Sequence, residues 1–145
     1  MRLLLTRTLR DLADTQALAR ELLPLLPHGA RVVLEGPLGA GKTTLARFLA
    51  EALGFRGRVT SPTYTLVHTY PTPEGPVVHA DLYRLKDPTA FLPELLAAQE
   101  EARLLLVEWG DPRALEADFL LRLIPEGGVR RAELWQLHPR QEQSV

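Results

Sequence analysis

The residues best suited to chemistry lie in one glycine-rich stretch. Residues 36–43 read GPLGAGKT, which fits the pattern G-x-x-x-x-G-K-[ST]. A loop that wraps a phosphate chain needs glycine where a Cβ would block the anion or where φ is positive. Lys42, expected here as an exposed loop lysine, supplies charge for the β- and γ-phosphates, and the Thr43 hydroxyl can bind Mg²⁺. The pattern predicts a phosphate-binding loop, or P-loop; the alternative is a glycine-rich turn before a lysine.

Two carboxylates stand where strands are expected to end. Asp81 follows the apolar pair Val77-Val78, and Glu108 follows the apolar run at 104–107. Magnesium sites on proteins usually take one or two carboxylates beside the phosphates. Asp81 is the shorter side chain and suits the metal, whereas Glu108 could bind Mg²⁺ through water, orient the attacking water or act as general base. Either one could instead be a surface carboxylate at a strand end.

A hydroxyl-rich segment is a further candidate. Residues 60–65 carry hydroxyl side chains on both sides of Pro62, and Ser61 and Thr63 are the two that we place in the site. Such a loop can sense a γ-phosphate or Mg²⁺ and become ordered on binding. It can equally be a turn that leads into a strand.

Two ring-bearing residues adjoin the carboxylates. His79 comes two residues before Asp81 and therefore shares its face of a strand, which allows either a role in the site or a hydrogen bond to a carboxylate. Trp109 follows Glu108 and could stack on a base, anchor a protein interface or pack in the core.

The elements that would position these residues alternate along the chain. Arg31 to Glu35 is a short apolar run typical of a buried strand, and Lys42 to Leu53 has the apolar stripe of a helix. Leu104 to Val107 is a continuous apolar run, typical of a strand that is buried on both faces. We therefore predict an α/β fold, a P-loop NTPase-like sheet with a parallel core around these two strands.

Antiparallel edges and flanking helices complete the predicted sheet. We expect an edge strand at 2–6 and two hairpins, one from 66–70 and 77–83 and one from 118–124 and 129–137. Thr8 and Asp11 fit a capping box that opens a helix reaching Leu26. Residues 89–101 suggest two short helical pieces broken by Pro93, and 113–117 suggest a short helix.

Composition limits the classes of function. With 145 residues, 46% of them hydrophobic, the chain suits one domain over residues 1–145. A formal net charge of -1 gives no general basic field, so we expect any nucleic acid to be reached through a partner or a local patch. The absence of cysteine excludes disulfides and thiolate metal sites, and the N-terminus lacks the apolar run of a signal or membrane span, so we expect a cytoplasmic protein. Without asparagine there is no N-K-x-D element, which predicts ATP or weak base discrimination.

Four segments together resemble a known family. The segments GPLGAGKTT, SPTYTLVHTY, HADLYRL and VEWGDP, in this order, resemble the bacterial TsaE (YjeE) family, the ATPase subunit required for threonylcarbamoyladenosine in tRNA. The resemblance covers roughly 12–124 and implies ATP and Mg²⁺ as ligands, TsaD and TsaB as partners, tRNA contact through that complex, and no membrane. One departure is Gly110, because the family commonly has proline there.

The resemblance also implies roles for the candidate residues. By the resemblance, Thr43 and Asp81 would hold Mg²⁺, residues 61–65 would act as a switch, and Glu108 and Trp109 would belong to the catalytic neighbourhood. Together with the analysis of the residues, this leads us to expect Lys42, Asp81 and Glu108 as catalytic residues and Thr43, Asp81 and Glu108 as metal ligands. The residues that would bind ATP are Gly36, Gly39, Ala40, Gly41, Lys42, Thr43, Thr44, Ser61, Thr63 and Trp109.

Two other functions remain open at this point. The chain could be a small-molecule kinase, although its length leaves little room for a lid and an acceptor site. It could also be an interaction module that ATP occupancy controls, with incidental hydrolysis. For the ATPase we expect slow turnover of the isolated protein, because an open site lacks the donors that a partner can add.

Overall fold

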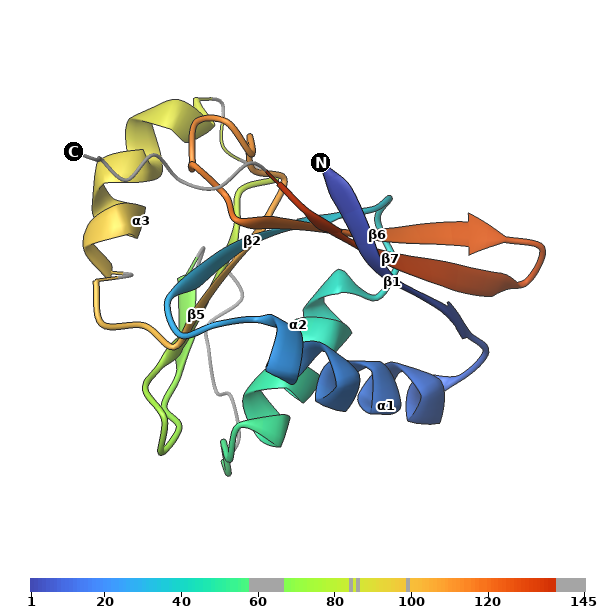
Figure 1. The fold of residues 1–145 in the computed structure, drawn as a ribbon. Helices are drawn as coiled ribbons and strands as arrows, with labels where there is room; N and C mark the ends of the chain where they lie inside the picture. Colours follow the sequence, from blue (N-terminus) through green and yellow to red (C-terminus); the bar gives the residue numbers. More distant parts are fainter. Residues whose placement is uncertain (58–66, 84, 86, 99, 138–145) are drawn as a thin grey trace.

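The computed structural model describes residues 1–57, 67–83, 85, 87–98 and 100–137. Within these ranges, seven strands form one sheet in the order β1-β7-β6-β2-β5-β4-β3 (Figure 1). The strands are β1 (Arg2–Leu9), β2 (Ala30–Glu35), β3 (Val67–Tyr70), β4 (Val77–Asp81), β5 (Leu104–Glu108), β6 (Phe119–Glu126) and β7 (Val129–Gln136). The helices are α1 (Leu12–Leu22), α2 (Lys42–Ala52) and α3 (Leu92–Ala98), with 3₁₀ turns η1 (Leu23–Leu25) and η2 (Pro88–Phe91).

The centre of the sheet is parallel. Strand β2 lies between β5 and β6 and runs parallel to both, and β4 runs parallel to β5. Every residue of β5 is buried, as expected for a strand that is covered on both faces. The predicted fold class is therefore confirmed, with β4 and β6 joining the parallel core. The carboxyl ends of β2, β4 and β5 meet at one edge of the sheet.

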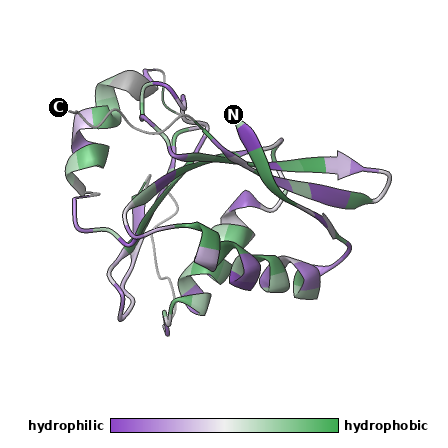
Figure 2. Ribbon diagram, viewed as in Figure 1, coloured by the Kyte–Doolittle hydropathy of each residue, from purple (hydrophilic) through white to green (hydrophobic). Residues whose placement is uncertain are grey.

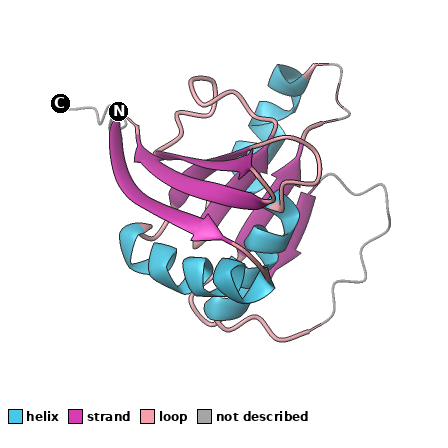
Figure 3. Ribbon diagram, turned by 90° about the vertical axis from the view of Figure 1, so that its right-hand side faces the viewer, coloured by secondary structure: helices cyan, strands magenta, loops and turns pink. Residues whose placement is uncertain are grey.

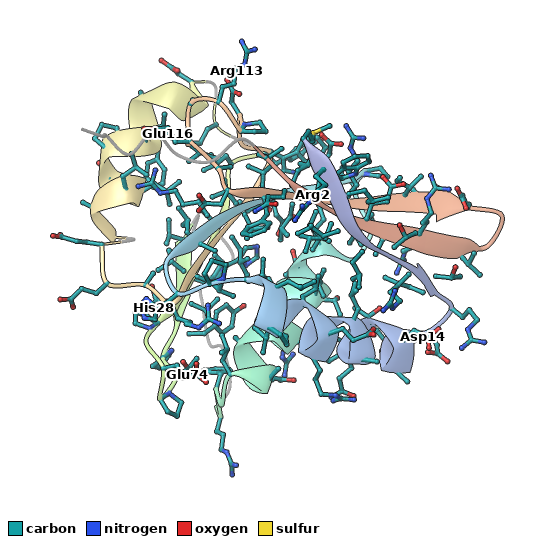
Figure 4. All side chains as sticks on the ribbon, viewed as in Figure 1. Arg2, Asp14, His28, Glu74, Arg113 and Glu116 are labelled. Atoms are coloured by element: carbon teal, nitrogen blue, oxygen red, sulfur yellow. The ribbon has the colours of Figure 1, made fainter. Side chains whose placement is uncertain are left out.

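Helices cover both faces of the sheet. Helices α1 and α2 pack on one face and α3 lies on the other (Figures 1 and 3). In β5, Leu104 and Leu106 join the apolar cluster beneath α1 and α2, whereas Leu105 and Val107 join the cluster on the α3 side. The strand alternation therefore places Glu108 on the α2 face. The apolar segments of the sheet and helices lie inward in Figure 2, and among the side chains labelled in Figure 4, His28, Glu74 and Arg113 lie at the periphery.

The edges agree with the predicted hairpins. Strands β3 and β4 pair antiparallel, as do β6 and β7, and β1 pairs antiparallel with β7. Residue 66 and the hydroxyl-rich segment, including Ser61 and Thr63, lie outside the described residues. No helix of the described part is long and apolar enough to cross a membrane.

Two local predictions were wrong. Thr8 does not cap α1, because pairing with β7 extends β1 to Leu9, and Asp11 is the cap, accepting a 2.9 Å hydrogen bond from the Asp14 N–H. The predicted helix at 113–117 is a series of turns that ends at Glu116, whose φ is 49°.

Two other helix boundaries differ from the prediction. The α-helical part of the first helix ends at Leu22 and continues as η1. The break in the 89–101 region comes before Leu92, because Pro93 lies in the first turn of α3, where it costs no hydrogen bond.

Candidate active site

The glycine-rich loop connects the end of β2 to the start of α2. A Cβ at Gly36 would lie 2.8 Å from the backbone oxygen of Leu123 on β6, so this position accepts only glycine without a shift. Gly41 precedes α2 with a φ of 100°, a conformation that side-chain-bearing residues rarely adopt. The unpaired N–H groups of the first turn of α2 thus adjoin the loop, which is the arrangement that binds anions.

Lys42 is buried, contrary to the expectation of an exposed loop lysine. Its side chain is 4% exposed, and its Nζ donates a 2.5 Å hydrogen bond to the Gly36 carbonyl oxygen. The Nζ also lies 4.0 Å from the centroid of the Trp109 ring, within reach of a cation–π interaction. Trp109, whose φ is 64°, covers part of the lysine with its ring and so contributes to the burial.

Trp109 and Tyr83 form an exposed aromatic pair next to the loop. Their ring centroids are 5.0 Å apart, and the two residues are 40% and 49% exposed. Core packing, one of the alternatives for Trp109, is therefore excluded. Gly110 follows at a crowded position, since a Cβ there would lie 2.7 Å from a Leu115 methyl group.

The two carboxylates end neighbouring strands. Asp81 and Glu108 are register partners across β4 and β5. The Thr43 hydroxyl donates a 2.9 Å hydrogen bond to Glu108 Oε2, and His79 Nε2 lies 2.6 Å from the same oxygen. Asp81 Oδ1 accepts a 3.0 Å hydrogen bond from the Tyr83 N–H. Of the two carboxylates, Glu108 is the one bonded to the predicted metal-binding hydroxyl.

The surroundings of Glu108 favour its ionised form. Burial acts to raise the pKa of this carboxyl, but the hydrogen bond and charge of His79 act against it, together with the Thr43 hydroxyl and the Lys42 charge. The balance holds the pKa below its ordinary value of 4.5. Glu108 is therefore a carboxylate at neutral pH, able to accept hydrogen bonds or to bind a cation.

A cavity of about 370 Å³ brings most of the candidate residues together. From the loop and carboxylates it is lined by Gly39, Ala40, Gly41, Lys42, Thr43, Thr44, Asp81 and Glu108. Gly36 and Trp109 instead line a second cavity of about 590 Å³, which Lys42 also lines. Lys42 therefore lies between the two hollows.

Arg130 is a site residue that the sequence did not reveal. It lines the cavity of the loop, and its Nη2 donates a 3.1 Å hydrogen bond to the Gly39 carbonyl oxygen. Leu9, Leu12 and Thr15 line the same cavity, and with Arg130 they also line an adjoining hollow of about 370 Å³. Nothing in the local pattern around these residues signals a site: the pairing of β1, β7 and β6 brings Leu9 and Arg130 to the loop, and α1 contributes Leu12 and Thr15.

The donors around the loop fit magnesium. Among the described residues, no group of three or more His, Cys, Asp and Glu side chains is arranged to hold a metal by itself. A hydroxyl and two carboxylates around a phosphate-binding loop are instead the oxygen donors with which proteins bind Mg²⁺ jointly with a nucleotide.

Comparison with known proteins identifies the family. The family model described as "Threonylcarbamoyl adenosine biosynthesis protein TsaE" matches residues 9–131. The chain belongs to the TsaE family. The matched residues include the whole loop, both carboxylates and Arg130.

Relatives in the TsaE family cover most of the chain. A Streptomyces coelicolor protein is 44% identical over 102 residues, which are 68% of this chain and 69% of that protein. A Mycobacterium tuberculosis protein is 43% identical over 115 residues, or 73% and 68% of the two chains. A Haemophilus influenzae protein is 39% identical over 109 residues, or 71% and 68%. All three are named tRNA threonylcarbamoyladenosine biosynthesis protein TsaE.

A solved structure agrees with the fold. The crystal structure of Bacillus subtilis YdiB aligns with a TM-score of 0.67 and 24% sequence identity, covering 95% of this chain and 89% of that one. This likeness supports the fold alone.

Proposed function

We propose that this protein binds Mg²⁺-ATP at residues 36–44 and hydrolyses it in the formation of threonylcarbamoyladenosine on tRNA, together with TsaD and TsaB. The relatives are named for this modification, which provides the biological context. The observation that carries the chemical part is the hydrogen bond from Thr43 to Glu108 within the cavity that Asp81 also lines.

The proposed binding mode follows from the loop. Backbone N–H groups of the loop and the first turn of α2 would surround the phosphates, and Lys42 would exchange its hydrogen bond with Gly36 for the β- and γ-phosphates. The Arg130 guanidinium, which already reaches the loop, adds a second positive charge at the same cavity. The adjoining hollow shared by Leu9, Leu12 and Thr15 provides space for the ribose and base.

The proposed metal ligands are Thr43 and the two carboxylates. The Thr43 oxygen can bind Mg²⁺ while its hydrogen remains on Glu108, so the observed hydrogen bond is compatible with metal binding. Mg²⁺ would neutralise the charge that develops on the phosphates. The carboxylate of Glu108 would then bind the metal directly or through water, or orient the attacking water.

The proposed partner surface is the aromatic pair. Exposed Trp109 and Tyr83 adjoin the buried Lys42, so a protein bound there would contact the nucleotide site. Aromatic residues are frequent anchors of protein interfaces. This position supports an ATPase whose active site TsaD and TsaB complete. It supports equally an interaction module that ATP occupancy controls.

Reconstitution tests the proposal. Purified TsaD and TsaB, tRNA and an activated threonylcarbamoyl donor are incubated with this protein, without it, or with its Thr43→Ala variant, and threonylcarbamoyladenosine is measured. We expect the modification to depend on the protein and on Thr43. Equal yields in all three reactions would refute the proposed function.

A second measurement separates hydrolysis from a kinase reaction. The proposal predicts free phosphate as the product of ATP, whereas a kinase would release ADP without an equal amount of free phosphate. A phosphorylated acceptor in place of free phosphate would assign the site to phosphoryl transfer.

A further inference from the structure

We propose that His79 is a positioning residue for the hydrolytic site: it holds the Glu108 carboxylate in the orientation that Mg²⁺-dependent hydrolysis needs. The inference rests on the proposed function and adds to it a residue that is not among those lining the cavity of the loop. His79 acts only through Glu108.

The hydrogen-bond partners of Glu108 come from two other elements. Thr43 in the first turn of α2 and His79 in β4 both bond to Oε2 of Glu108 at the end of β5, at 2.9 and 2.6 Å. His79 is 1% exposed and Glu108 3% exposed, so water competes little for these hydrogen bonds. A glutamate has three rotatable side-chain bonds, and two donors on one oxygen restrict them strongly.

The direction of the hydrogen bond follows from the acceptor. An ionised carboxylate has no proton to give, so Nε2 of His79 carries the hydrogen. Both hydrogen bonds that Glu108 forms with described residues end on Oε2, which leaves Oε1 as the oxygen not engaged by them. The pair of donors thus determines which carboxylate oxygen remains for the cavity.

The other nitrogen of His79 lowers the net contribution of this side chain to stability. Nδ1 is buried and has no hydrogen-bond partner in the described part of the chain. A buried polar atom without a partner costs free energy, whereas an apolar side chain of similar size at this position would not incur that cost. A histidine at this position can donate a hydrogen bond to Glu108, and an apolar residue cannot.

For the metal site, the consequence is that the Glu108 carboxylate keeps a fixed orientation beside Thr43. If Thr43 binds Mg²⁺ through its oxygen, its hydrogen stays on Oε2, and His79 holds the same oxygen with a second hydrogen bond. Without His79, Glu108 retains one of its two hydrogen bonds and regains side-chain freedom. Partners that orient metal-binding groups typically affect metal affinity or activity by 10- to 100-fold.

Two variants test the inference. His79→Leu removes the donor while filling a similar volume, and His79→Gln places an amide N–H where Nε2 lies. For each we would measure the Mg²⁺ concentration for half-maximal ATP hydrolysis, kcat, nucleotide affinity in the presence of a chelator, and the melting temperature.

The inference predicts a specific pattern. His79→Leu should raise the half-maximal Mg²⁺ concentration or lower kcat by about 10- to 100-fold. Its metal-free nucleotide affinity should stay within about twofold, because the loop contacts are intact. Its melting temperature should change little, because the loss of the hydrogen bond to Glu108 is offset by the removal of a buried unpaired nitrogen. His79→Gln should recover most of the activity.

Three other results would contradict the proposed role of His79. Wild-type Mg²⁺ dependence and kcat in His79→Leu would overturn the inference while the proposed function stands. Equal losses in both variants, with lowered melting temperatures, would assign His79 a structural role and overturn it as well. If the wild-type protein shows no Mg²⁺-dependent hydrolysis, alone or with TsaD and TsaB, the proposed function fails and the inference fails with it.

Discussion

Asp81 and Glu108 stand side by side at the ends of β4 and β5, and both line the cavity that Thr43 also lines. The relation follows from strand geometry. In a parallel pair the carboxyl ends lie at one edge, and residues with the same alternation face the same side. His79 and Asp81 in β4 and Leu106 and Glu108 in β5 therefore all face α2, whose first turn carries Thr43.

Replacing Lys42 with methionine should weaken ATP binding without unfolding the protein. Methionine keeps most of the buried stem that packs beside Trp109 and removes the charge. A hydrogen bond to a charged group contributes about 1.5–3 kcal/mol, so calorimetry should show a Kd raised by about 10- to 150-fold. Arg47→Met is a matched control on α2, because Arg47 pairs with Glu51 away from the loop. An unchanged Kd in Lys42→Met would contradict the loop assignment.

Replacing Asp81 with asparagine should impair Mg²⁺-dependent hydrolysis more than nucleotide binding. Asparagine keeps an oxygen that can accept the Tyr83 N–H bond, so the turn is preserved while the charge for the metal is lost. We expect phosphate release to fall by about 10- to 100-fold across Mg²⁺ concentrations, with metal-free affinity nearly unchanged.

The control for this variant lies in the loop that follows β5. Asp111→Asn makes the same chemical change where Oδ1 accepts a 3.0 Å bond from the Arg113 N–H, and it should leave hydrolysis unaffected. Wild-type hydrolysis by Asp81→Asn would mean that Asp81 is only a strand-end carboxylate.

Much of this arrangement could be predicted from the sequence. The apolar run at 104–107 indicated a strand buried on both faces, and the loop indicated the strand and helix on either side of it. Once those strands are parallel, the position of Glu108 beside the loop follows. The hairpin partner of β3 could also be predicted, because β3 and β4 are joined by a short turn rich in proline and glycine.

The remainder depended on contacts between distant parts of the chain. Arg130 reaches Gly39 because β7 lies between β6 and β1, an order that no local pattern specifies. The burial of Lys42 depends on the left-handed backbone of Trp109, which a tryptophan rarely adopts. The Thr8 capping box failed because pairing with β7 kept Thr8 in a strand.

The pKa of Glu108 predicts a pH dependence of stability. Its folded pKa lies below the ordinary value of 4.5, so the folded state binds the proton less tightly than the unfolded state does. The resulting stabilisation is fully present above about pH 4.5 and is lost as the pH falls through the folded pKa. Glu108→Gln lacks this contribution.

Thermal unfolding at several pH values checks this sign. The melting temperature of the wild-type protein minus that of Glu108→Gln should decrease as the pH falls from 6 toward 3, roughly the range in which carboxylates titrate. If this difference stays constant or increases on acidification, the lowered pKa of Glu108 is contradicted.

Replacing Tyr83 with alanine should weaken the response to partners. The exposed Tyr83 ring contacts Trp109, and its backbone N–H, which holds Asp81, is kept in the variant. We expect an unchanged rate of phosphate release alone and an apparent affinity for TsaD and TsaB lowered by about tenfold or more. Leu3→Ala, at an exposed position on β1, is the control. An unaltered partner response in Tyr83→Ala would place the interface elsewhere.

The most direct test of the central claim is phosphate release from ATP, measured during threonylcarbamoyladenosine formation with TsaD, TsaB and tRNA. We predict slow release by the isolated protein, faster release with the partners, and loss of both release and repeated modification in Glu108→Gln. Sustained modification by Glu108→Gln without phosphate release, or equal release with and without the partners, would contradict the claim that hydrolysis at this site serves the modification.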